Sequence, residues 1–255
     1  MKNIFLSLSL IIISTNLIHA QLVNVESKRL QNDTTRFATV LRASYMYKQS
    51  NTTTFSLLNG SATIQARSKS LKDIFLALGS YDLTKSNSNN INNAGFVHLR
   101  YTRKFNDFLR WGAFAQNQTH EKLKIDNRTL IGTGPRFKLV NKPNFKSSLG
   151  TLYMYEIEET LEDNPQQNLD HRLSSYFTFT YAFPNDICEL NSITYYQPVV
   201  NNFSDCRITN QTSLSFKVIK QVSFEVSVKY LYDTSPPEGV ISHSFASKMG
   251  VKVSF

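Results

Sequence analysis

The sequence predicts an all-β fold, an up-and-down antiparallel transmembrane β-barrel of about twelve strands. Three observations predict it. The last segment alternates apolar and polar residues, similar segments fill the chain from residue 36 onward, and the connections between them alternate in length. A membrane barrel produces this combination because each strand faces lipid on one side and the lumen on the other.

The final segment, residues 242–255, shows the alternation most regularly. From Phe245 to Phe255 the odd positions are mostly apolar, and the even positions are polar or small. Successive side chains of a strand point to opposite faces, so this segment has one apolar and one wet face. We expect it to close the barrel, with Phe255 as a barrel-assembly signal. An edge strand of a soluble secreted β-sandwich that binds a ligand or partner would alternate in the same way.

The N-terminal residues 1–20 are typical of a bacterial secretory signal peptide for Sec export. A basic start at Lys2 precedes an apolar run, residues 4–13, that is too short to span a bilayer. Residues 21–35 are polar without a period, and we expect them to form a periplasmic lead-in. No later apolar run is long enough for a membrane helix, so a mature protein in the membrane would be a barrel.

The barrel is expected to fill residues 36–255, with both termini in the periplasm of a cell whose outer membrane holds the protein. The expected strands are residues 36–47, 52–66, 71–82, 94–104, 108–119, 125–140, 144–158, 169–183, 186–197, 206–219, 221–232 and 242–255. Each is about as long as a tilted strand that crosses a bilayer.

Connection lengths support the up-and-down arrangement. Short connections are expected at residues 105–107, 141–143 and 184–185 and around Lys220, and long ones at residues 85–93, 159–168, 198–205 and 233–241. A barrel with one short-turn rim and one long-loop rim produces this rhythm, whereas a Greek-key sandwich has no reason to keep it.

Pairing the strands about their tight turns brings the apolar faces together. In the hairpin around Lys220, Phe216 falls opposite Phe224. In the hairpin at residues 105–107, Tyr101 falls opposite Trp111. Coinciding faces are what a shared sheet requires.

The polar face carries long charged side chains of both signs. They are Arg100, Arg110, Arg128, Arg136, Arg172, Lys217, Lys229, Lys248 and Lys252, with Glu156, Glu158 and Glu225. Pairing predicts Arg128 opposite Glu156, with Glu158 diagonal to it. Such pairs either fill the lumen or form a selectivity ring or solute site, and the positive surplus favours anions.

Composition limits the partners. The net charge is +9, and Lys and Arg are scattered singly along strands, so we expect no nucleic-acid partner. Only 18% of residues are charged, yet the mean hydropathy of −0.29 is too low for a helical membrane protein. The expected partners are outer-membrane lipid, lipopolysaccharide and the barrel-assembly machinery, and the oligomeric state stays open.

No catalytic, cofactor-binding or metal-ligating residues are predicted, and no cofactor is expected. Ser242 and Ser244 flank His243, but neighbours in a strand point to opposite faces. A barrel-wall enzyme acting on lipid or lipopolysaccharide stays an alternative to a narrow pore or a structural, stress-related barrel. Cys188 and Cys206 are expected at opposite rims, too far apart for a disulfide.

One stretch resembles a known family. The runs ALGSYDLTKS, GFVHLRYTRKFNDFLRWGAFAQNQ, NRTLIGTGPRF and LGTLYMYEIEE, within residues 77–158, are similar to the salt-induced outer-membrane proteins, a bacterial domain family of unknown function. The likeness includes Arg128, Gly132 and Gly134 in an Arg-x-x-x-Gly-x-Gly strand. The resemblance implies an outer-membrane barrel and no activity.

Overall fold

A computed structural model gives the fold. It describes residue 25 and residues 36–87, 89–162, 164–219 and 222–253. The signal peptide, the lead-in apart from Val25, and Phe255 lie outside the described residues, so those expectations stay predictions. Within the described part of the chain, no helix is long and apolar enough to cross a membrane.

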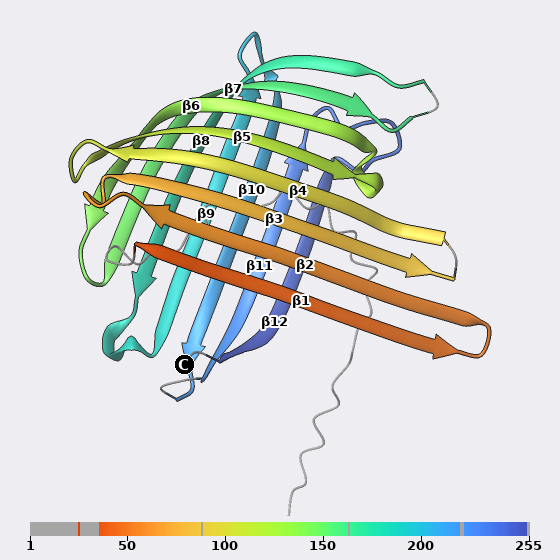
Figure 1. Ribbon diagram of the computed structural model, residues 1–255, viewed down its shortest axis with the longest axis horizontal. Helices are drawn as coiled ribbons and strands as arrows, with labels where there is room; N and C mark the ends of the chain where they lie inside the picture. Colours follow the sequence, from red (N-terminus) through yellow and green to blue (C-terminus); the bar gives the residue numbers. More distant parts are fainter. Residues whose placement is uncertain (1–24, 26–35, 88, 163, 220–221, 254–255) are drawn as a thin grey trace, which may run out of the picture.

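The described residues form one sheet of twelve antiparallel strands, each paired with its neighbours in the sequence (Figure 1). The strands are β1 (Phe37–Ser50), β2 (Thr53–Arg67), β3 (Asp73–Ser86), β4 (Asn89–Lys104), β5 (Leu109–His120), β6 (Ile125–Asn141), β7 (Phe145–Thr160), β8 (Gln167–Ala182), β9 (Cys188–Val199), β10 (Asn202–Lys217), β11 (Val222–Asp233) and β12 (His243–Val253). In the connections that the structure describes lie the short 3-10 helices η2 (Glu121–Leu123) and η3 (Pro184–Asp186).

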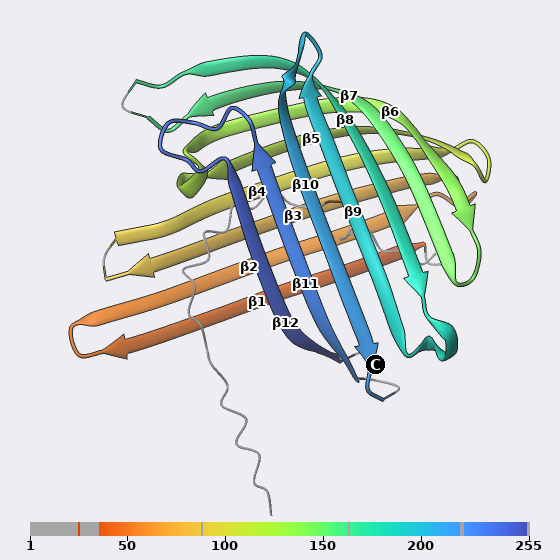
Figure 2. The ribbon, with the colours of Figure 1, turned by 180° about the vertical axis from the view of Figure 1, so that it is seen from behind.

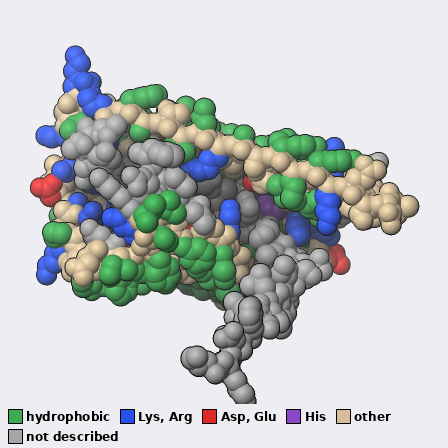
Figure 3. Space-filling model, turned by 90° about the horizontal axis from the view of Figure 1, so that it is seen from below, with side chains coloured by type: hydrophobic (Ala, Val, Ile, Leu, Met, Phe, Trp, Pro, Cys, Tyr) green, Lys and Arg blue, Asp and Glu red, His purple; other side chains and the backbone are tan. Residues whose placement is uncertain are grey.

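The sheet curls so that β1–β4 lie across from β9–β12 and enclose an interior (Figures 1 and 2). The underside is hollowed between these two layers (Figure 3). The predicted all-β, up-and-down antiparallel barrel of about twelve strands is therefore confirmed. A Greek-key sandwich would interrupt the order of the strands, and the observed order β1 to β12 runs without a break. Within the described ranges, β1 and β12 form no ladder with each other.

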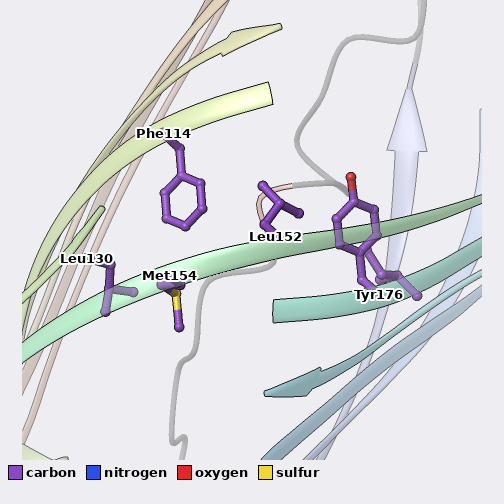
Figure 4. Close-up of a cluster of buried hydrophobic side chains, with 6 residues drawn as sticks. Phe114, Leu130, Leu152, Met154 and Tyr176 are labelled. Atoms are coloured by element: carbon purple, nitrogen blue, oxygen red, sulfur yellow. The ribbon is translucent and has the colours of Figure 1, made fainter. Parts of the chain in front are cut away.

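The interior face carries the buried residues. Along β7 from Ser148 to Thr160, for example, the even positions are buried and the odd positions are partly or fully exposed. A compact apolar cluster sits on this inner face at mid-strand, formed by Phe114, Leu130, Leu152, Met154, Tyr176 and Ile193 (Figure 4). The strand periodicity of two, noted in the sequence, thus separates an inner from an outer surface.

Glycines on the inner face make room for these rings. A side chain at Gly150 would collide with the ring of Tyr176, and one at Gly132 would meet the ring of Phe114. Aromatic rings therefore occupy the space beside both glycines.

Gly134→Ala is expected to destabilise the fold by about 1–3 kcal/mol, the usual cost of overpacking. The added methyl would collide with the carbonyl oxygen of Thr151 and lie 2.6 Å from the Cα of Leu152, so the backbone itself must shift. Gly60→Ala is the matched control, because nothing lies within 4 Å of its Cβ position. Urea titration followed by heat-modifiable gel mobility measures both. Equal midpoints for the two variants would contradict this account of the packing.

The connections follow the predicted rhythm only in part. We call the end of the sheet with the β2–β3, β4–β5, β6–β7, β8–β9 and β10–β11 connections the terminal rim, because β1 begins and β12 ends there. The opposite end is the distal rim.

The long loops expected at residues 85–93 and 198–205 are wrong, since β4 begins at Asn89 and β10 at Asn202. Polar residues continue the backbone ladder there, because hydrogen bonding needs no apolar side chains.

The hairpin registers show which pairings could be predicted. Around residue 220 the prediction is confirmed, with Phe216 opposite Phe224. Tyr101, however, faces Ala113, and Trp111 faces Arg103, a shift of two positions. Asn106 causes the shift. Its side-chain oxygen accepts the backbone N–H groups of Phe108 and Leu109, so the turn takes four residues.

The two cysteines are both free thiols. Cys188 pairs with Phe216 at one end of β9, and Cys206 pairs with Pro198 at the other. The predicted separation of the two thiols is confirmed.

Candidate functional site

The interior near the distal rim holds a group of charged side chains that we call the ionic network. Its centre is formed by Arg128 on β6, Glu156 and Glu158 on β7, Arg172 on β8 and Arg207 on β10. All five are at most 5% exposed. Charged groups with so little water are stable only when opposite charges and hydrogen bonds replace it.

The strand ladder places the first pair. Arg128 stands opposite Glu158, and its guanidinium binds the Glu158 carboxylate through two nitrogens. The Arg128 Nε also lies 3.5 Å from Glu156 Oε1. The sequence predicted the three partners, but with Arg128 opposite Glu156. The turn pairs Lys142 with Phe145, which moves the register by three positions from the predicted one. The irregularity between Lys138 and Val140 removes one of them, and the remaining shift of two keeps the faces.

Arg172 continues the network along β8. Its Nε lies 3.2 Å from Glu156 Oε2, and its terminal nitrogens bind Asp170 at 2.9 Å and Asp205 at 3.1 Å. One of them also donates to the carbonyl oxygen of Gln197. The guanidinium thereby links β7, β8 and the start of β10.

Arg207 brings together strands that are not neighbours in the sheet. It projects from β10 and reaches β7 past β8 and β9, with distances of 2.5 Å to Glu156 Oε1 and 3.2 Å to Glu158 Oε2. Its Nε donates to Asp233 on β11 at 2.7 Å. These contacts are possible because the curled sheet turns its inner face toward itself. Arg207 therefore forms a brace across the interior.

The sequence prediction missed Arg207, Asp170, Asp205 and Asp233. Arg207 and Asp170 share the inward parity of their strands, so the alternation could have marked them as polar-face residues. Three arginines and five carboxylates give the network an acidic surplus. That sign is opposite to the positive surplus predicted for the lumen as a whole.

Three other predicted lumen residues lie toward the terminal rim. Arg110 and Arg136 stand opposite each other on β5 and β6. Arg100 lies with its guanidinium 5.8 Å from the centre of the Phe114 ring, within the range of a cation–π contact. Arg136 also donates to Ser148. The interior is therefore basic toward one rim and acidic toward the other.

The remaining predicted lumen residues belong to β10–β12 and take no part in the ionic network among the contacts described. Lys217 and Glu225 lie diagonally across the β10–β11 ladder, as predicted. Lys248 faces Ser227, and Lys252 faces Ser223. Lys229 lies opposite Gln211, on the same face. The ladder thus places Lys217, Glu225, Lys229 and Lys248 on one face of the sheet.

Ser242 and His243 differ from expectation. The Ser242 hydroxyl lies 3.4 Å from His243 Nδ1, whereas alternation predicted opposite faces. Ser242 precedes the first residue of β12, so strand alternation does not apply to it. Both residues lie at the distal rim, where the carbonyl oxygen of Ser242 accepts the backbone N–H of Asp233.

Comparisons with known proteins give one family. The family model described as "Protein of unknown function, DUF481" matches residues 41–255. No curated protein matches the chain. Solved structures similar to it include the NanC porin, at 12% identity and a TM-score of 0.49, covering 86% of this chain and 99% of that one. A KdgM porin is 14% identical with a TM-score of 0.43, and the match covers 86% of this chain and 99% of that one. A bacterial polysaccharide outer-membrane secretin is 9% identical with a TM-score of 0.48, and the match covers 86% of this chain and 91% of that one. The fold assignment rests on the strand order and pairing above.

Proposed function

Since this chain belongs to the DUF481 family of proteins of unknown function, with a match over residues 41–255, we propose its role from its own surfaces. The protein is a bacterial outer-membrane β-barrel, built like a pore, whose bore is narrowed by charged side chains. Its two termini lie in the periplasm. Outer-membrane lipid and lipopolysaccharide surround it, and the barrel-assembly machinery inserts it.

One observation carries this proposal, the inverted polarity of the sheet. On the outer face Leu99 is 55% exposed, Ile131 59% and Met249 68%, while Glu156 and Arg172 inside are 1% and 2% exposed. A protein surrounded by water buries its large apolar residues and keeps its charges outside. Lipid around the outer face accounts for the reverse, since the apolar band then contacts hydrocarbon.

The bore is narrow because the interior is filled. Barrels of about eight strands are packed with side chains, and those of about sixteen hold open channels. In a barrel of about twelve strands, the size of the inward side chains therefore determines how wide the bore is. The apolar cluster occupies the middle and the ionic network one end. The cavity between His98, Phe114, Tyr176 and Gln197 holds only about 60 Å³. The resemblance of residues 77–158 to salt-induced outer-membrane proteins supports the membrane placement and a stress-related setting.

The purified protein in planar bilayers is expected to show small or no conductance, with a weak preference for anions. Most charged residues that face inward outside the ionic network are Arg and Lys, and a positive lining concentrates anions. Arg128→Gln should release Glu156 and Glu158 from one of their partners and shift the ion selectivity toward cations.

Arg103→Gln is the matched control for this experiment. Arg103 binds Asp73 at 2.5 Å on the exposed side of the terminal rim, outside the bore. Its replacement should leave selectivity unchanged. A large cation-selective pore in the unmodified protein would contradict the proposal, and turnover of lipid or lipopolysaccharide by the purified barrel would favour the enzyme instead.

A further inference from the structure

Besides the apolar cluster at mid-strand, the inner face has a second sector that is apolar where a water-filled bore would favour polar groups. Ile74, Leu76 and Leu78 on β3 and Ala94 and Phe96 on β4 point inward, and each is at most 8% exposed. We call these five residues the inner patch. In a bore lined by water such side chains would be exposed, at a cost of about 25 cal/mol for each Å² of apolar surface.

Val25 covers part of the inner patch. It is only 5% exposed and packs in one cluster with Leu76, Leu78 and Phe96. It precedes the first strand of the sheet, so this contact joins a residue from outside the barrel wall to the inside of that wall. Val25 also lines the 60 Å³ cavity, together with Arg100, Phe114 and Tyr176.

We propose that the inner patch is a docking surface for the N-terminal segment of the same chain, with Val25 as its anchor. A valine side chain gains free energy when it is buried against apolar surface, and the inner patch supplies such a surface. Val25 packs directly on it. The inward residues His98, Arg100 and Gln116 beside the patch are polar or charged, whereas Phe114 on β5 belongs to the apolar cluster. Burial of a valine side chain therefore favours the inner patch over its polar neighbours.

A cross-linking experiment tests the docking. Cysteines are placed at Val25 and Leu78 in a chain with Cys188→Ser and Cys206→Ser, and the folded protein is treated with an oxidant that joins two thiols only when they lie within disulfide distance. The matched control pairs Val25→Cys with Ala77→Cys, because Ala77 is the chain neighbour of Leu78 and points to the outer face. Mass spectrometry of the digest should show the 25–78 link in clear excess over the 25–77 link, because residues 78 and 77 project from opposite faces of β3.

Heat-modifiable mobility confirms that each variant is folded. Equal yields of the two links in folded protein, or no 25–78 link at all, would overturn the docking. In a second test, a maleimide is reacted with the thiol of Leu78→Cys. The Val25→Asp substitution should make this thiol react faster, because Asp does not cover the inner patch, whereas Val25→Leu should keep it protected. These readouts need no current through the barrel, so they can fail or succeed independently of the proposed pore.

Discussion

Arg207→Ala is expected to destabilise the barrel by about 3–5 kcal/mol, the cost of leaving buried charges without their partner. The guanidinium contacts Glu156, Glu158 and Asp233, and the two glutamates are buried. After the substitution, both glutamates keep Arg128 as a partner but lose the brace from β10. Equilibrium unfolding in urea, with folded protein in lipid vesicles, gives the change in free energy of unfolding.

Arg103→Ala provides the comparison. Its pair with Asp73 is exposed to water, so its loss should cost less than about 1 kcal/mol. A double-mutant cycle with Glu156→Gln separates the coupling from the individual losses. The account is contradicted if Arg207→Ala and Arg103→Ala have the same effect, or if Arg207 and Glu156 show no coupling.

Val226→Arg should cost about 2–4 kcal/mol if Val226 lies near the bilayer midplane, because the charge would then face hydrocarbon. Val226 sits in the middle of β11, opposite Leu214 and Met249 on the outer face. The sequence places the alternate positions from Val222 to Tyr232 and from Met249 to Phe255 on this lipid side.

Ser213→Arg is the matched control for Val226→Arg. Ser213 precedes Leu214 and faces Asn191 and Ser227 on the inner side. The same charge there enters a polar bore and should cost clearly less. Both variants are refolded into vesicles and titrated with urea. A smaller loss for Val226→Arg than for Ser213→Arg would mean that the outer and inner faces have been exchanged.

Most of the sheet could be predicted from the sequence because alternation with period two marks both the strands and their faces. All twelve expected segments overlap an observed strand. The errors lie where alternation gives no information. A shift of two positions, as at Tyr101 and at Arg128, leaves every side chain on its proper face, so the pattern cannot detect it. The turn at Asn106 causes the first shift, and the turn between Lys142 and Phe145 together with the irregularity after Lys138 causes the second.

The ionic network could be predicted only where its members lie on adjacent strands. Arg128, Glu156 and Glu158 belong to one hairpin, and local pairing brings them together. Arg207 reaches the same glutamates from a strand three positions away in the sheet, which depends on how strongly the sheet curls. Hairpin pairing carries no information on that curvature.

The single tryptophan reports most directly on whether lipid surrounds the outer face. Trp111 projects outward from β5, is 45% exposed, and donates its indole N–H to Thr133. We propose measuring its fluorescence in vesicles that contain brominated phospholipids, and in parallel with iodide in the water. A membrane barrel predicts strong quenching by the brominated lipid and weak quenching by iodide. Quenching by iodide alone, in a protein that remains in solution without detergent, would contradict the transmembrane barrel.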